Sequence, residues 1–285
     1  TQQDLLGRFY ERHDAQKAVK YLPWGLKKLD IPYVELRGVN GKSFTRLTDD
    51  EVLDVRDLLA RYGIKVWSLG SPIGKIHTND DFEAHKHLLT RIMDIGDMLD
   101  VKRIRMFSFY PEAGISREEF EKKAFSMIGE LLDMAEARGF VLCHENEKDI
   151  YGQSSESVKK LCDHFGGRLR AVLDSGNLAF SNENSVNVYP LLKDYIEYLH
   201  IKDAEQNGAI VVPGTGDAHL AETLAQVNAD RTDDVVLTVE PHLTIFGGLS
   251  SLSNLDDIKH KNVFSTAFEA FETATEALRG IINNL

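Results

Sequence analysis

Four residues that could bind a metal ion lie at the ends of apolar, β-rich runs in the second half of the sequence. They are Glu145, Asp174, His200 and Glu240, in the runs FVLCHE, LRAVLD, EYLHIK and VVLTVE. Successive side chains of a strand point to opposite faces. In the last run, Glu240 therefore shares a face with Val236 and Thr238, and the same alternation turns the other three residues toward one side of a sheet.

Three carboxylates and one imidazole in a confined space predict a bound cation. Carboxylates that meet in a cavity repel one another, and each is costly to bury in its ionised form. This ligand set suits one divalent ion, and we expect Mn²⁺ first among Mn²⁺, Mg²⁺, Co²⁺ and Zn²⁺. No thiolate takes part, so we do not expect a closed structural zinc site.

Further polar residues near the same run ends are candidates for substrate contact. They are Glu35, Lys75, Arg105, His144, Lys202 and His242. The cations among them could bind an anionic substrate such as a sugar phosphate or sugar acid, or they could neutralise the carboxylates of the site. A short turn, GTGD (214–217), could offer backbone N–H groups to a phosphate, with Asp217 capping the next helix.

The elements that must position these residues repeat along the chain. Seven β-rich runs end near residues 36, 69, 109, 145, 174, 202 and 240, at a mean spacing of about 34 residues. Helical patterns fill the spaces, at 48–62, 78–99, 116–138, 154–166, 187–195, 217–229 and 262–284. Strands that alternate with helices at this spacing indicate βαβ units and a parallel sheet.

Eight such units would occupy about 272 residues, close to the 285 present. We therefore predict one α/β domain over residues 1–285, a (β/α)₈ TIM barrel whose active site lies at the carboxyl ends of the strands. Residues 14–29 look helical, so the first strand is expected around Leu5–Tyr10, in an irregular form. An open doubly wound sheet is the alternative, although no G-x-G-x-x-G follows the first clear strand.

Composition excludes several classes of protein. The formal net charge of −12 disfavours general binding to nucleic acids or anionic membranes. No apolar run is long enough for a transmembrane helix, and the first residues show no signal-peptide pattern. Only two cysteines are present, so we expect no disulfide framework and a cytoplasmic location.

The sequence resembles the xylose isomerase-like TIM-barrel superfamily, and most closely its sugar phosphate isomerase/epimerase group. The matching segments are YVELRG, GIKVWSLGSPIGK, RIRMFSFY, HENEKDIYG, VLDSGN, YLHIKDA, VPGTGD and VEPHL. The resemblance implies a metal site formed by Glu145, Asp174, His200 and Glu240. It also implies a sugar isomerase or epimerase that removes a proton next to a carbonyl and stabilises the enediolate with the metal. Glu145 and Glu240 are the expected acid/base residues.

Two departures leave the reaction open. Ketose 3-epimerases of the superfamily tend to carry His and Arg where this chain has Asn177 and Gln206. The alternatives are an inosose-type dehydratase on the same site, an endonuclease IV-like DNA-repair enzyme, and a non-catalytic sugar-binding barrel. The acidic charge disfavours the nuclease, so the expected partner is a small sugar or sugar phosphate and no nucleic acid. Relatives also suggest a homodimer or homotetramer.

Overall fold

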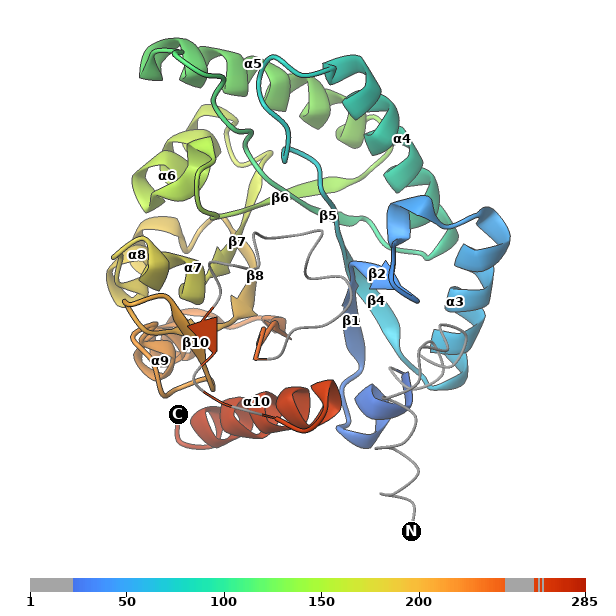
Figure 1. Cartoon of the computed structure of the whole chain (residues 1–285), viewed down its shortest axis with the longest axis vertical. Coiled ribbons are helices and arrows are strands. Elements are labelled where there is room, and N and C mark those ends of the chain that lie inside the picture. Colours follow the sequence, from blue (N-terminus) through green and yellow to red (C-terminus); the bar gives the residue numbers. More distant parts are fainter. Residues whose placement is uncertain (1–22, 244–258, 261, 263) are drawn as a thin grey trace.

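The computed structural model describes residues 23–243, 259, 260, 262 and 264–285. Among them, seven parallel strands form one sheet that curls almost into a closed barrel, which confirms the predicted fold class (Figure 1). In order across the sheet they are β1 (Tyr33–Leu36), β4 (Lys65–Gly70), β5 (Arg103–Met106), β6 (Val141–Glu145), β7 (Arg170–Asp174), β8 (Ile196–Ile201) and β11 (Leu237–Val239).

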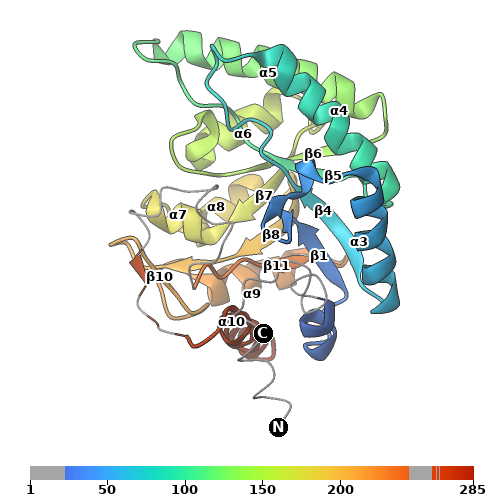
Figure 2. The ribbon, with the colours of Figure 1, turned by 45° about the vertical axis from the view of Figure 1, so that its right-hand side comes forward.

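Helices surround the sheet, as both views of the ribbon show (Figures 1 and 2). They are α3 (Asp49–Arg61), α4 (Phe82–Met98), α5 (Arg117–Glu136), α6 (Ser155–His164), α7 (Ser175–Phe180), α8 (Ser185–Leu192), α9 (Leu220–Asp230) and α10 (Ala267–Ile282). Short elements complete the described chain: β2 (Gly38–Val39), β3 (Lys42–Ser43), η1 (Phe44–Arg46), η2 (Tyr151–Gln153), β9 (Asp203–Ala204), β10 (Ala209–Val211) and β12 (Lys259–His260). No helix of the described residues is both long and apolar enough to cross a membrane.

Helix α3 shows how local sequence sets these elements. The Thr48 side chain accepts a hydrogen bond from the Glu51 backbone N–H at 3.2 Å. The Glu51 side chain in turn accepts a hydrogen bond from the Thr48 backbone N–H at 2.9 Å. This capping box satisfies two N–H groups that a helix start leaves unpaired. Gly63 follows the helix with φ +70°, a backbone conformation that suits glycine.

Strand β5 is shorter than the predicted run, which extended to residue 109. It ends at Met106 because the next residues pair instead with the segment that follows β4. The Phe107 N–H donates to the Ile73 carbonyl and the Phe109 N–H donates to the Gly74 carbonyl, both at 2.8 Å. A sequence pattern that records only β propensity cannot show which partner such a segment has.

Other differences concern helix boundaries. The predicted helix at 78–99 begins later, at Phe82, because Asp81 caps it by accepting from the Ala84 N–H at 2.9 Å. The helix α7 was not predicted. The predicted first strand, around Leu5–Tyr10, lies outside the described residues. Of the predicted helix at 14–29, residues 23–29 are described, and 23–28 are helical.

The side-chain alternation predicted for the strands is present inside the barrel. Cys143, Val172 and Tyr198 form a buried cluster there, against the partly buried Trp67 and Val236. The larger apolar clusters lie between the sheet and the helices. The interior is therefore filled with side chains below the carboxyl ends of the strands, where the buried polar residues Glu145, Asp174 and His200 lie.

Candidate metal centre at the carboxyl ends of the strands

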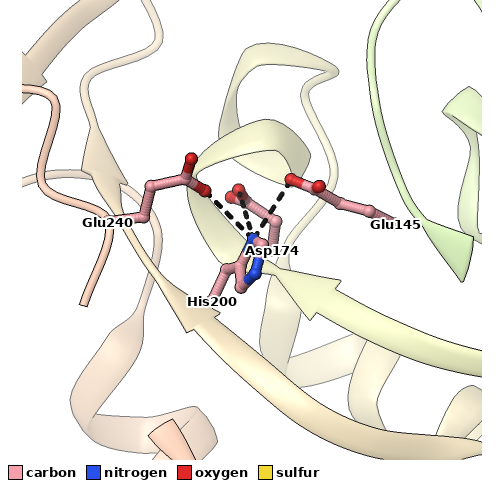
Figure 3. A group of neighbouring side chains, drawn as sticks. All are labelled: Glu145, Asp174, His200 and Glu240. Carbon is pink, nitrogen blue, oxygen red and sulfur yellow. Dashed lines mark hydrogen bonds and ion pairs between the residues drawn. The ribbon is translucent and has the colours of Figure 1, made fainter. Parts of the chain in front are cut away.

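Glu145, Asp174, His200 and Glu240 converge on one point, as Figure 3 shows. The His200 Nδ1 atom lies 3.0 Å from Glu240 Oε2, 3.2 Å from Glu145 Oε1 and 3.9 Å from Asp174 Oδ2. One such atom from each residue lies within 4.8 Å of the others. All four side chains are mostly or wholly buried, the most open being Glu240 at 12% exposure.

The strand register brings these residues together. Asp174 is the register partner of His200 in the β7–β8 pair, and Glu240 directly follows β11, which pairs with β8. Asn146, just after β6, ties two strand ends to each other. Its side-chain amide donates to the Asp174 carbonyl and accepts from the Asp174 N–H, each at 2.9 Å.

Asp174 uses its two carboxylate oxygens differently. Oδ1 caps α7 by accepting from the Asn177 N–H at 2.8 Å. Oδ2 points into the cluster, where it is buried and meets no donor in hydrogen-bond geometry among the described residues, although Lys202 Nζ lies 2.9 Å away. The structural role of helix capping and a ligand role are thus compatible in one side chain.

Glu145 and Glu240 also divide their oxygens. Glu145 turns Oε1 toward His200, and its Oε2 lies 3.1 Å from the Arg105 Nε. Glu240 turns Oε2 toward His200, while its Oε1 contacts the Arg37 guanidinium and lies 2.9 Å from His242 Nε2. A basic group therefore holds the oxygen of each glutamate that faces away from the cluster.

Glu35 lies behind His200. The Glu35 Oε2 atom is 3.2 Å from His200 Nε2, and it also accepts hydrogen bonds from Ser68 Oγ at 2.7 Å and from the Tyr198 hydroxyl at 2.6 Å. This contact leaves Nδ1 as the imidazole nitrogen that faces the three other residues. In this arrangement Glu35 orients His200 from below the cluster.

Several acidic groups lie close together in the cluster, and this crowding shifts the pKa values of its members. Burial alone would lower the pKa of His200, but Glu35 and Glu145 raise it to about 9. Burial would raise the pKa of Glu145, yet His200 and Arg105 hold it well below its usual range. Burial raises the pKa of Asp174, and Lys202 offsets only part of that effect. Positive charge inside the cluster is therefore strongly favoured.

The residues present fit a divalent cation. Three carboxylate oxygens and one imidazole nitrogen form a donor set that Mn²⁺, Mg²⁺, Co²⁺ and Zn²⁺ all accept. The buried Asp174 Oδ2, without a hydrogen-bond donor among the described residues, is an atom that such an ion would satisfy. Neither cysteine belongs to the cluster.

The other predicted site residues lie at different depths. Arg105 and Lys202 are buried within the site, and Lys202 Nζ donates to the side-chain amide oxygen of Asn177 (Oδ1) at 2.6 Å in addition to its contact with Asp174. Lys75 lies nearer the mouth, 3.2 Å from Glu147 Oε2.

His144 is not brought into the cluster. Its Nε2 lies 2.9 Å from Ser108 Oγ, and its ring packs against the Gly152 backbone. Alternation along β6 accounts for this position, because His144 and Glu145 are successive residues and point to opposite faces. We therefore no longer propose it as a substrate-binding residue.

Two residues near the centre were missed at the sequence level, Arg37 and Glu147. Each follows a predicted site residue by two positions, Glu35 and Glu145 respectively, just beyond the end of a strand. The alternation rule, continued for one more step past the strand, would have found both.

The predicted role of the GTGD turn is wrong. The carboxylate of Asp203 accepts the N–H groups of Gly214, Gly216 and Ala218 at 2.7, 3.0 and 3.1 Å, so these donors already have an anionic partner. Asp217 does not cap α9 either. It accepts from the Gln206 N–H at 2.8 Å, and the helix begins after His219.

Several solved structures share the fold of this chain. Similar solved structures include D-psicose 3-epimerase from Clostridium cellulolyticum H10 (TM-score 0.71, 17% identity, covering 93% of this chain and 92% of that one). Another is the IOLI protein with a binding zinc atom (TM-score 0.71, 20% identity, 93% of both chains). A third is the probable 3-DHS dehydratase AsbF from Bacillus anthracis (TM-score 0.70, 13% identity, 93% of both chains).

At these identities the solved structures show a shared fold. No curated protein matches the sequence. The sequence pattern that describes the xylose isomerase-like TIM barrel matches residues 26–255, which include all four residues of the cluster. The chain therefore belongs to the xylose isomerase-like TIM-barrel family.

Proposed function

We propose that this protein is a divalent-metal-dependent isomerase or epimerase that acts on a sugar-like hydroxy-carbonyl compound. One observation carries the proposal. Glu145 Oε1 and Glu240 Oε2 flank His200 Nδ1 from different sides, at 3.2 and 3.0 Å, within a buried cluster that fits one divalent ion (Figure 3). Two carboxylates beside a cation at a barrel mouth suit proton abstraction next to a carbonyl group.

Glu145, Asp174, His200 and Glu240 would hold the ion. When bound, it would supply positive charge beside the oxygens on which negative charge develops. Glu145 and Glu240 would move the proton: one carboxylate removes it from the carbon next to the carbonyl, and the other returns a proton. Return to the opposite face of the same carbon inverts that centre, whereas return to the neighbouring carbon exchanges ketose and aldose.

Elimination of water from the same site is the second candidate. It begins with the same proton abstraction, but a hydroxyl group on the next carbon then leaves. Two observations favour keeping it: a probable dehydratase is among the similar solved structures, and Asn177 replaces the histidine typical of ketose 3-epimerases. The two reactions differ in product mass by one water.

A screen for hydrogen exchange tests both candidates. Protein loaded with Mn²⁺ or Mg²⁺ is incubated in D₂O with ketoses, aldoses and inososes, and C–H signals are followed by NMR. We expect exchange with retained mass for an isomerase or epimerase, and loss of water for a dehydratase. Glu145→Gln and Glu240→Gln should each abolish exchange, whereas Glu130→Gln, at an exposed ion pair with Lys86, should not. An active Glu240→Gln variant would contradict the assigned chemistry.

A further inference from the structure

We infer that the substrate is an uncharged polyhydroxy carbonyl compound, and that Glu147 is a specificity-determining residue that excludes its phosphorylated counterparts. The inference rests on the proposed function and names its substrate class. It depends on where each positive group at the mouth finds its partner, and on the sum of formal charges around the cluster.

Among the described residues of the mouth, Arg37, Lys75 and Arg105 already have carboxylate partners. Arg37 and Lys75 are the more open ones, with side-chain exposures of 23% and 17%. Arg37 contacts Glu240 and Lys75 contacts Glu147. The deeper Arg105, at 3% exposure, lies against Glu145 and Glu35.

The Glu147 carboxylate is held beside Lys75 by contacts of both its oxygens. Its Oε1 accepts from the Lys148 N–H at 3.0 Å, and its Oε2 lies 3.2 Å from Lys75 Nζ. The ammonium of Lys75 is also fixed on its other side, 4.2 Å from the centre of the Phe107 ring. Burial lowers the pKa of both Lys75 and Arg37, and the charge of Glu147 opposes that effect in each case. A phosphate that approached Lys75 would have to displace this carboxylate.

The turn that the sequence suggested for phosphate binding offers no replacement. The turn that could have held a phosphate, residues 214–217, is wrapped around the Asp203 carboxylate. A Cβ atom at Gly216 would lie only 2.4 Å from Asp203 Oδ1, which shows how closely the turn encloses that side chain. Its N–H groups are therefore not available to a ligand.

The sum of formal charges around the cluster also favours an uncharged substrate. The described residues of the site include five carboxylates and four basic side chains, namely Glu35, Glu145, Glu147, Asp174 and Glu240 with Arg37, Lys75, Arg105 and Lys202. These nine formal charges sum to one net negative charge, so a divalent ion would bring the sum to one net positive charge. A neutral carbonyl compound that loses a proton gains one negative charge, and this balances the site when the charge develops. A phosphate dianion would make the sum of formal charges negative before any reaction begins.

Binding of inorganic phosphate tests the role of Glu147 without any turnover. Phosphate is titrated into metal-free and Mg²⁺-loaded protein and followed by calorimetry and ³¹P NMR. We expect Glu147→Gln to bind phosphate at least tenfold more tightly than the wild type, because Lys75 loses its competing carboxylate. The control Glu130→Gln should match the wild type. Phosphate affinity that is equally high in the wild type would overturn the inference.

Matched sugar pairs provide the second test. Exchange rates in D₂O are compared for D-fructose and D-fructose 6-phosphate, and for D-xylulose and D-xylulose 5-phosphate. We expect kcat/KM to be at least tenfold higher for the uncharged member of any pair that reacts, with a smaller ratio in Glu147→Gln. Preference for the phosphate would overturn the inference and leave the proposed function intact. Absence of exchange in every pair would count against the proposed function for these substrates, and phosphate binding would then decide the inference alone.

Discussion

Replacing Glu35 by Gln should weaken metal binding although Glu35 is not one of the four converging residues. The change keeps the size of a side chain that is 3% exposed and removes only its charge. The carboxylate accepts from His200 Nε2 at 3.2 Å, from Ser68 and from Tyr198, so it fixes the imidazole whose Nδ1 faces the cluster. An amide in its place is a weaker acceptor and can turn its NH₂ group toward the ring.

The size of the effect follows from this contact. A hydrogen bond to a charged group contributes about 1.5–3 kcal/mol and one between neutral groups about 0.5–1.5 kcal/mol. The difference, about 1–1.5 kcal/mol, corresponds to roughly 5- to 12-fold in an affinity. Partners of metal-bound histidines typically change metal affinity by about 10- to 100-fold when mutated. We therefore expect the Kd for Mn²⁺ to rise about tenfold.

Calorimetric titration of Mn²⁺ into metal-free protein measures this change. Ser68→Ala is the matched comparison, since it removes one donor to Glu35 and keeps the charge, and its effect should be smaller. Glu130→Gln controls for the loss of a carboxylate elsewhere. The thermal unfolding of each variant shows whether the fold is retained. A folded Glu35→Gln protein whose Kd stays within twofold of the wild type would refute the reasoning.

Three further predictions concern stability. Mn²⁺ at about 100 times its Kd should raise the free energy of unfolding by about 2.7 kcal/mol, seen as a higher Tm, and Asp174→Ala should abolish the rise. His85 accepts from the Gly74 N–H at 2.8 Å, and burial lowers its pKa to about 4 against 6.5 when unfolded. The unfolded state therefore binds the proton first as pH falls, so between pH 7 and 4.5 the wild type should lose about 2 kcal/mol more stability, measured by urea unfolding, than His85→Gln. Gly74→Ala should cost more stability than Gly63→Ala in the same assay, because both have positive φ but only at Gly74 would a Cβ meet backbone, 2.0 Å from the Phe107 carbonyl oxygen.

Much of the fold could be predicted from sequence because its signals are local. Capping boxes at Thr48 and Ser116 and the alternation within each strand depend on residues a few positions apart. The grouping of Glu145, Asp174, His200 and Glu240 needed only alternation and the rule that parallel strands end at one edge of the sheet. The assigned roles of these four residues stay predictions until metal binding is measured.

The features that sequence did not reveal depend on distant partners. Strand β5 ends early because residues 107–109 bond to the loop after β4, and the turn at 214–217 encloses Asp203 from another segment. Nothing within either segment specifies that partner. His144 is a different case: the alternation that selects Glu145 also places its neighbour on the opposite face, and proximity in sequence alone suggested a shared site.

The two oxygens of each carboxylate have different contacts, and this difference affects which ion the cluster would bind. Asp174, Glu145 and Glu240 each present one oxygen to the centre, and the second is engaged by the Asn177 N–H, by Arg105, or by Arg37 and His242. Each acid is thus prepared for monodentate coordination. Ca²⁺ prefers six to eight oxygen ligands, often including bidentate carboxylates, and would have to break these contacts to obtain them. Smaller divalent ions would be held by one oxygen of each carboxylate and by His200 Nδ1, so they would need no such rearrangement.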